Sequence, residues 1–119
     1  MENKEFARKL EIRTKQFAIR IIRLSASLPN TQEGRVVRNQ LTKSGTSIGA
    51  NYREANRARS KADFYNKIQI CESESSETAY WLEIVIDMNW VESKEAILML
   101  TEANELLAIF TSVSNSLKP

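Results

Sequence analysis

Residues 38–55 read RNQLTKSGTSIGANYREA, and this stretch decides the fold of the chain. Its apolar and small residues recur every three or four positions, which is the spacing of one face of an α-helix. The face consists of Leu41, Ser44, Ile48, Asn51 and Ala55. Gly45 and Gly49 each cost a helix interior about 1 kcal/mol relative to alanine. The stretch therefore predicts a long helix whose small side chains allow a neighbouring helix to approach closely.

The same spacing extends outward through the rest of the chain. With 3 glycines and 2 prolines among 119 residues, little interrupts a helical pattern. Helices are expected over residues 3–28, 30–57, 61–89 and 94–117. Pro29 ends the first, because the residue before a proline avoids α geometry. The expected N-terminal caps are Asn30 with Glu33, Ser60 with Asp63, and Ser93.

Each expected helix has an inward stripe. The predicted core side chains are Phe6, Leu10, Phe17, Ile21, Leu24 and Leu28, then Val37 and the face listed above, then Phe64, Ile68, Cys71, Ser75, Thr78, Leu82 and Val85, and finally Ile97, Leu100, Ala103, Leu107 and Phe110. Short connections between helices of this length force antiparallel neighbours. The fold class is therefore all-α, an antiparallel up-down-up-down four-helix bundle that forms one domain over residues 1–119.

A turn near Ser60 predicts which residues of the second and third helices face each other. Ser44 is expected opposite Ser75, and Ile48 opposite Cys71. The middle of this helix pair is thus small and polar where an ordinary bundle has leucine. Close helix approach explains this, and a polar pocket is the alternative.

Composition excludes most catalytic and metal chemistry. The chain has no histidine and a single cysteine, whereas zinc sites and Ser-His-Asp or Cys-His pairs need imidazole or several thiolates. The paired carboxylates Glu72, Glu74, Glu77 and Glu83 are interpreted as a solvated helix face. We therefore expect no enzyme activity, no cofactor, no metal and no small-molecule substrate.

Cysteine usage and hydropathy indicate the compartment. Cys71 has no partner for a disulfide, which suits a reducing cytoplasm. The longest uncharged stretch, residues 106–117, is far shorter than the roughly 20 residues that span a bilayer. A soluble cytoplasmic protein without a membrane partner is expected.

Charge is divided unevenly along the chain. Residues 1–61 hold 14 basic and 5 acidic side chains, net +9, and residues 62–119 hold 3 and 10, net −7. Two functions compete: binding of RNA or DNA backbone by the basic half, and a protein-interaction scaffold without nucleic acid. The candidate phosphate contacts are Arg8, Arg13, Lys15, Arg20, Arg23, Arg35, Arg38, Arg53, Arg57 and Arg59.

The chain also has more large apolar residues than its inward stripes use. The surplus comprises Ile12, Ile19, Ile70, Trp81, Ile84, Trp90, Leu98 and Leu106. A contiguous patch of this kind marks an interface, whereas scattered exposed apolar residues are normal. The two oppositely charged halves either attract a neighbouring copy or neutralise each other within one bundle. A homo-oligomer is expected.

The run of residues 38–55, followed by Ser60, Asp63-Phe64 and residues 77–82, resembles the four-helix-bundle or 23S rRNA intervening-sequence protein family. The most specific part is the pattern R-x-Q-L-x-x-S-x-x-S-I-x-x-N, here Arg38, Gln40, Leu41, Ser44, Ser47, Ile48 and Asn51. The resemblance implies a non-enzymatic, ribosomal-RNA-associated bundle that forms a homopentameric ring, with these motif residues in structural roles. The chain is similar also to the accessory protein of diversity-generating retroelements, which works with RNA.

Overall fold

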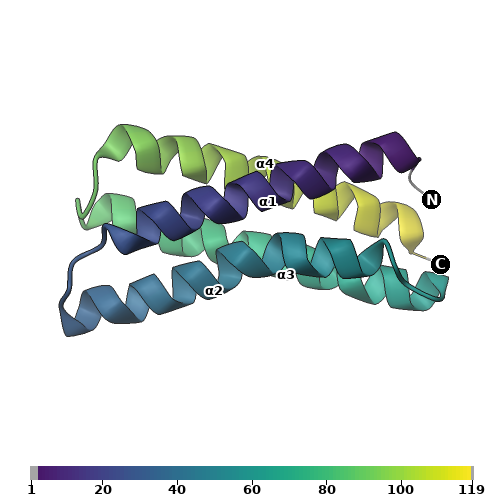
Figure 1. The fold of residues 1–119 in the computed structure, drawn as a ribbon, viewed down its shortest axis with the longest axis horizontal. Helices are drawn as coiled ribbons and strands as arrows, with labels where there is room; N and C mark the ends of the chain where they lie inside the picture. The colour runs from purple at the N-terminus through teal and green to yellow at the C-terminus, as the bar shows by residue number, and fades with distance from the viewer. Residues whose placement is uncertain (1–2, 119) are drawn as a thin grey trace.

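A computed structural model describes residues 3–118 as four helices, with no strand among them. They are α1 (Lys4–Ala26), α2 (Gln32–Ala55), α3 (Lys61–Asp87) and α4 (Ser93–Leu117). Successive helices run antiparallel along a bundle about 44 Å long, so the two ends of the chain lie at the same end of the bundle (Figure 1). The predicted all-α bundle is confirmed.

The helix caps agree with the sequence in part. Ser60 caps α3 as predicted, because its hydroxyl accepts a 3.0 Å hydrogen bond from the Asp63 amide. The prediction of Asn30 as the cap of α2 is wrong: the Gly34 amide donates to Thr31 Oγ1 at 3.0 Å. Asn30 Oδ1 instead accepts from Arg35 Nη1 at 3.2 Å.

The fourth helix begins one residue earlier than expected. Glu92 is the extended N-cap residue and makes no side-chain capping bond. Its carbonyl oxygen accepts from the Ala96 amide, so Ser93 is already helical. The prediction of Ser93 as the cap is therefore wrong by one position.

The predicted core is correct for α3 and only partly correct for the other helices. Every predicted stripe residue of α3 is buried. Phe6, in contrast, is 40% exposed near the start of α1. Asn51 is half-buried, and the neighbouring Tyr52 is fully buried with its ring centroid 5.5 Å from that of Phe110.

In α4 the buried face differs from the prediction. The buried residues are Ala96, Met99, Ala103, Leu106, Phe110 and Ser114. Ile97 is exposed, while Leu100 and Leu107 are half-buried. Because α4 has apolar residues nearly all round, its periodicity did not single out one face.

The small residues in the middle of the bundle serve close packing. Cys71 Sγ lies 3.5 Å from the carbonyl oxygen of Ile48, as the antiparallel register predicts. The hydroxyls of Ser44 and Ser75 are fully buried, and each donates to a carbonyl of its own helix, at 3.3 and 2.8 Å. These hydroxyls therefore need no polar partner across the helix pair, which favours the packing interpretation over a polar pocket.

The glycines of α2 allow α1, rather than α3, to approach. A Cβ atom on Gly45 would lie 2.7 Å from Ile21 Cγ2, and one on Gly49 would lie 3.0 Å from Thr14 Oγ1. These distances leave no room for a methyl group at Gly45. The missing side chains therefore bring the two basic helices together.

Candidate nucleic-acid interface

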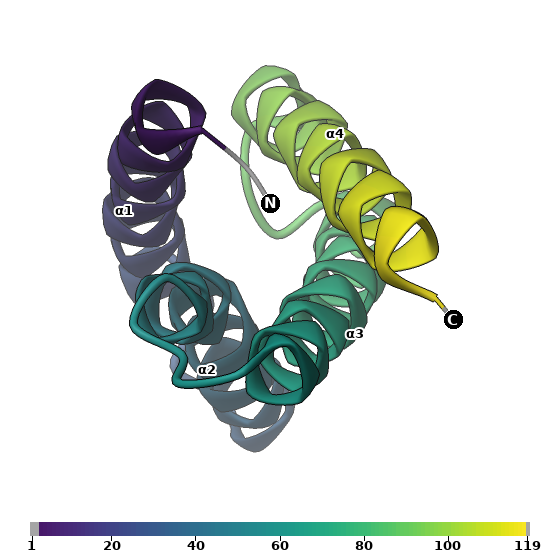
Figure 2. The same cartoon turned by 90° about the vertical axis from the view of Figure 1, so that its right-hand side faces the viewer.

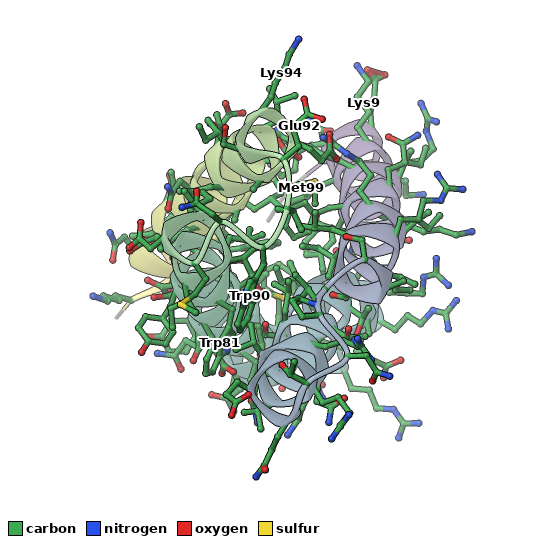
Figure 3. The ribbon with its side chains drawn as sticks, turned by 90° about the vertical axis from the view of Figure 1, so that its left-hand side faces the viewer. Lys9, Trp81, Trp90, Glu92, Lys94 and Met99 are labelled. Carbon is green, nitrogen blue, oxygen red and sulfur yellow. The ribbon has the colours of Figure 1, made fainter. Side chains whose placement is uncertain are left out.

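Helices α1 and α2 carry eight of the ten arginines and lysines that the sequence singles out as candidate phosphate contacts. Arg57 and Arg59 lie just beyond the end of α2, in the connection to α3. Side chains tipped with nitrogen extend outward from this side of the bundle (Figure 3). The structure divides the ten into residues with partners inside the protein and residues without.

Two of them join α1 to α4 along what we call the α1–α4 seam. Arg13 binds Glu102 through both Nε and Nη2, at 2.6 and 2.7 Å, and Nη2 also donates to Glu105 at 2.7 Å. One heptad further along α1, Arg20 lies 3.9 Å from Glu95. These pairs span the side of the bundle where the ribbons of the first and last helices lie apart (Figure 2).

Arg13 is held in an ion pair at the seam and is not free for a phosphate. The hydrogen bond to Glu102 is the main cause that raises the pKa of Arg13 above its ordinary value. The guanidinium is thus held as a cation in a bidentate pair, a geometry that lysine cannot reproduce. Part of the charge asymmetry is therefore neutralised within one bundle, as the second of the two charge interpretations predicts.

Three more of the candidate arginines contact the protein itself. Arg53 Nε lies 3.8 Å from a carboxylate oxygen of Glu11, and Arg35 donates to Asn30. Arg38 Nη2 donates to the carbonyl oxygens of Leu28 and Pro29, at 2.8 and 3.3 Å. Arg38 therefore holds the connection between α1 and α2 in place.

The remaining five candidates are exposed and form no ion pair or side-chain hydrogen bond within residues 3–118. They are Arg8, Lys15, Arg23, Arg57 and Arg59. Their cationic groups are free to meet an anion from solution. We call these five the free cations.

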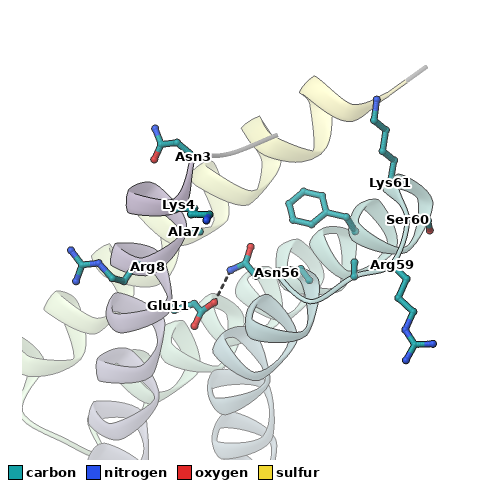
Figure 4. Close-up of a pocket in the computed structure, with 12 residues that line it drawn as sticks. Asn3, Lys4, Ala7, Arg8, Glu11, Asn56, Arg59, Ser60 and Lys61 are labelled. Carbon is teal, nitrogen blue, oxygen red and sulfur yellow. Dashed lines mark hydrogen bonds between the residues drawn. The ribbon is translucent and has the colours of Figure 1, made fainter.

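Two hollows are lined by three of the free cations, Arg8, Lys15 and Arg59. A cavity of about 610 Å³, the end pocket, opens where the start of α1 meets the connection between α2 and α3 (Figure 4). A shallower groove between α1 and α2 is lined by Lys15 and Arg53, and shares Glu11 with the end pocket. Lys4 and Lys61 also line the end pocket. The sequence analysis did not include these two lysines among the candidate phosphate contacts, although both directly follow a helix cap.

Two of the acidic residues of α3 accept hydrogen bonds from neighbouring side chains. No group of three or more acidic or cysteine side chains within residues 3–118 is placed to hold a metal ion. Glu72 accepts from the Thr111 hydroxyl at 2.9 Å, and Glu77 from the Trp81 indole at 3.0 Å. Burial, followed by repulsion from Glu77, raises the pKa of Glu74.

The surplus apolar residues differ in how far they are buried. Leu106 is fully buried, and Trp81, Ile84 and Trp90 pack partly against the core. The exposed members are Ile12, Ile19, Ile70 and Leu98.

Within the described residues, α4 alone is long and apolar enough for a membrane span, a test that core helices of soluble proteins also pass. Its exposed apolar side chains, Ile97 and Leu98, lie outside the bundle core.

The motif residues of α2 contact the bundle and their own helix. Leu41, Ser44 and Ile48 are fully buried. Ser47 Oγ donates to the Lys43 carbonyl at 2.7 Å, and Asn51 Nδ2 to the Ser47 carbonyl at 2.9 Å.

Comparisons with known proteins agree with this bundle. A family model described as 23S rRNA-intervening sequence protein matches residues 8–112. A crystal structure from Bacteroides thetaiotaomicron, described as a protein of unknown function from the S23 ribosomal protein family, is similar with a TM-score of 0.80 and 38% identity. The match covers 87% of this chain and 96% of that one. No curated protein matches the chain.

Proposed function

The chain belongs to the 23S rRNA-intervening sequence protein family, and we propose that it is a non-enzymatic cytoplasmic protein that binds the backbone of RNA or DNA. The binding surface is the basic side of α1 and α2. The protein acts as a homo-oligomer, most simply the pentamer that the family resemblance implies.

The observation that carries this proposal is the set of five free cations. Side chains already held by carboxylates or carbonyls must lose those partners before they meet a phosphate. The free cations have no such partner, and all are exposed. Contacts of this kind bind the phosphate backbone without reading sequence. We therefore expect a sequence-tolerant interaction governed by salt.

The exposed apolar side chains support self-association. Ile12 on α1 and Leu98 on α4 are 46% and 50% exposed, on the two helices that meet at the seam. Large apolar side chains that water reaches are stabilised when another surface covers them. Several copies of a weak basic surface on one particle would raise its affinity through avidity. Sedimentation equilibrium tests this part, and a mass of 13.6 kDa at micromolar concentration would reject it.

Binding is tested with the double variant Arg8→Gln, Lys15→Gln against fluorescent single-stranded RNA at several salt concentrations. Each lost phosphate contact should lower the slope of log affinity against log salt by about 0.7. The pair should therefore weaken binding and flatten the slope by about 1.4. Lys67→Gln with Lys94→Gln, on α3 and α4, is the matched control and should change neither.

The competing function is a protein-interaction scaffold. It too would use the exposed apolar residues, but it predicts no salt-dependent RNA or DNA binding by the parent protein. A protein that binds neither nucleic acid at low salt would favour the scaffold. A raised ratio of 260 to 280 nm absorbance in the purified protein would favour nucleic-acid binding.

A further inference from the structure

We propose that the end pocket is a nucleotide subsite that takes one unstacked base with its phosphate. This inference deepens the proposed function, on which it rests for the source of the nucleotide. The ligand chemistry is a heteroaromatic base joined to a phosphate, supplied either by the end of a single strand or by a free mononucleotide.

The pocket has an apolar wall suited to a base. Ala7, Ala55, Ala58 and Phe64 line it, and Phe64 contributes an aromatic ring. A volume of about 610 Å³ lies within the range of about 300–1,000 Å³ that small-molecule sites occupy. Aromatic and apolar walls bind bases without strong sequence preference, because every base has a π face. This wall distinguishes the pocket from the charged surface around it.

The rim of the pocket is complementary to phosphate. Lys4, Arg8, Arg59 and Lys61 surround the opening, against a single carboxylate, Glu11. In Figure 4, Arg8, Arg59 and Lys61 extend outward from the rim, where exposed side chains can turn toward a bound anion. The rim also includes the Asn3 and Ser60 caps, so the positive ends of α1 and α3 lie here, beside the negative C-terminal end of α2 at Ala55 and Asn56.

Polar groups inside the pocket can contact a base edge. Asn56 Nδ2 donates to Glu11 Oε2 at 2.8 Å across the gap between α2 and α1 (Figure 4). The amide oxygen of Asn56 remains available as an acceptor for the exocyclic amine of a base, whereas the second oxygen of Glu11 lies 3.8 Å from Arg53 Nε. The groove between α1 and α2 meets the pocket at Glu11, so a strand lying along the groove would reach it.

The test fills the pocket without changing its charge. Ala7→Leu adds three carbon atoms to the apolar wall from a half-buried helical position. Ala26→Leu, at the exposed far end of α1, is the matched control, and circular dichroism checks that both variants keep their helices. The probes are an oligoadenylate of about 12 nucleotides, a blunt RNA duplex of the same length, and AMP.

We expect Ala7→Leu to weaken binding of the single strand by about tenfold, which is the effect of losing one stacked base. Its affinity for the duplex should stay within about twofold, because the phosphate contacts remain. The control should change neither. If the parent protein binds RNA and Ala7→Leu leaves both affinities unchanged, the subsite is wrong while the proposed function stands.

A parent protein that binds no RNA or DNA would refute the proposed function, and AMP then decides the subsite. AMP that shifts the amide resonances of Asn56 and Ala58 in the parent protein, but not in Ala7→Leu, would support a site for a free nucleotide. The absence of such shifts would overturn the inference.

Discussion

Replacing Arg13 with glutamine is expected to destabilise the bundle at the α1–α4 seam. Arg13 makes three hydrogen bonds to two carboxylates of α4, and all are shorter than 2.8 Å. Glutamine keeps part of the stem but has neither the charge nor the bidentate fork. Glu102, whose side chain is only 20% exposed, would lose its cationic partner.

The size of the effect follows from exposure. Hydrogen bonds to charged groups contribute about 1.5–3 kcal/mol, while fully exposed ion pairs contribute about 0–1 kcal/mol. The Arg13 side chain is 37% exposed, so solvent screens part of the interaction. We therefore expect a loss of about 1–2 kcal/mol. At about 4 °C per kcal/mol for a domain of this size, Tm should fall by about 4–8 °C.

A double-mutant cycle with Glu102→Gln measures the pair directly, by thermal unfolding at one fixed protomer concentration. The expected coupling energy is about 1 kcal/mol, and it should decrease at high salt. Arg13→Lys should restore less than half of it, because lysine cannot bind both carboxylate oxygens in parallel. Arg23→Gln, on the same helix and without a partner, is the control. A coupling energy below about 0.3 kcal/mol, or an equal loss of stability in the control, would refute a stabilising role for the Arg13–Glu102 pair.

Three further predictions concern the interior and the acidic face. Ser44→Leu should overpack the helix interface and cost about 1–3 kcal/mol, and an unchanged urea midpoint would contradict the packing of this face. Gly45→Ala should destabilise the bundle despite a gain in helix propensity of about 1 kcal/mol, because its methyl group would meet Ile21; a higher Tm would show that α1 can move away. Burial raises the pKa of Glu74 in the folded state, so its ionised form lowers stability at pH 7 and this cost disappears as the pH falls below the ordinary value of 4.5. Glu74→Gln should thus raise Tm at pH 7 and have little effect near pH 4, and an equal change at both pH values would argue against this titration.

How well the sequence predicted the core depended on the contrast between helix faces. In α3, polar residues such as Glu72 and Ser76 separate the apolar positions, so the stripe was read correctly. In α4, Ile97, Leu98 and Met99 follow one another, and only packing against α3 shows that Met99 is the buried one. Periodicity carries information only where the opposite face is polar.

The candidate site was predictable as a surface but not as a set of contacts. Composition located the basic charge on the first half of the chain. It could not show that Arg13 and Arg20 face α4, because that contact joins the two ends of the sequence. Charge reversal at these two positions would place like charges against Glu102, Glu105 and Glu95 and so destabilise the bundle. Lys4 joins Arg59 and Lys61 at one pocket only in the folded bundle.

The seam also connects the two parts of the proposed function. Glu95 and Glu102 lie one heptad apart on α4, so their pairs with α1 fix which side of α4 meets α1. Ile97 lies two positions beyond Glu95, about 200° around the helix, whereas Leu98 is three positions from Glu95 and four from Glu102 and so lies on the seam side; both are exposed. The arginines of the seam therefore hold α4 with the exposed Ile97 on a face directed away from α1. If that face mediates self-association, loosening the seam with Arg13→Gln should weaken the oligomer as well as the fold, and it should do so without removing any of the five free cations.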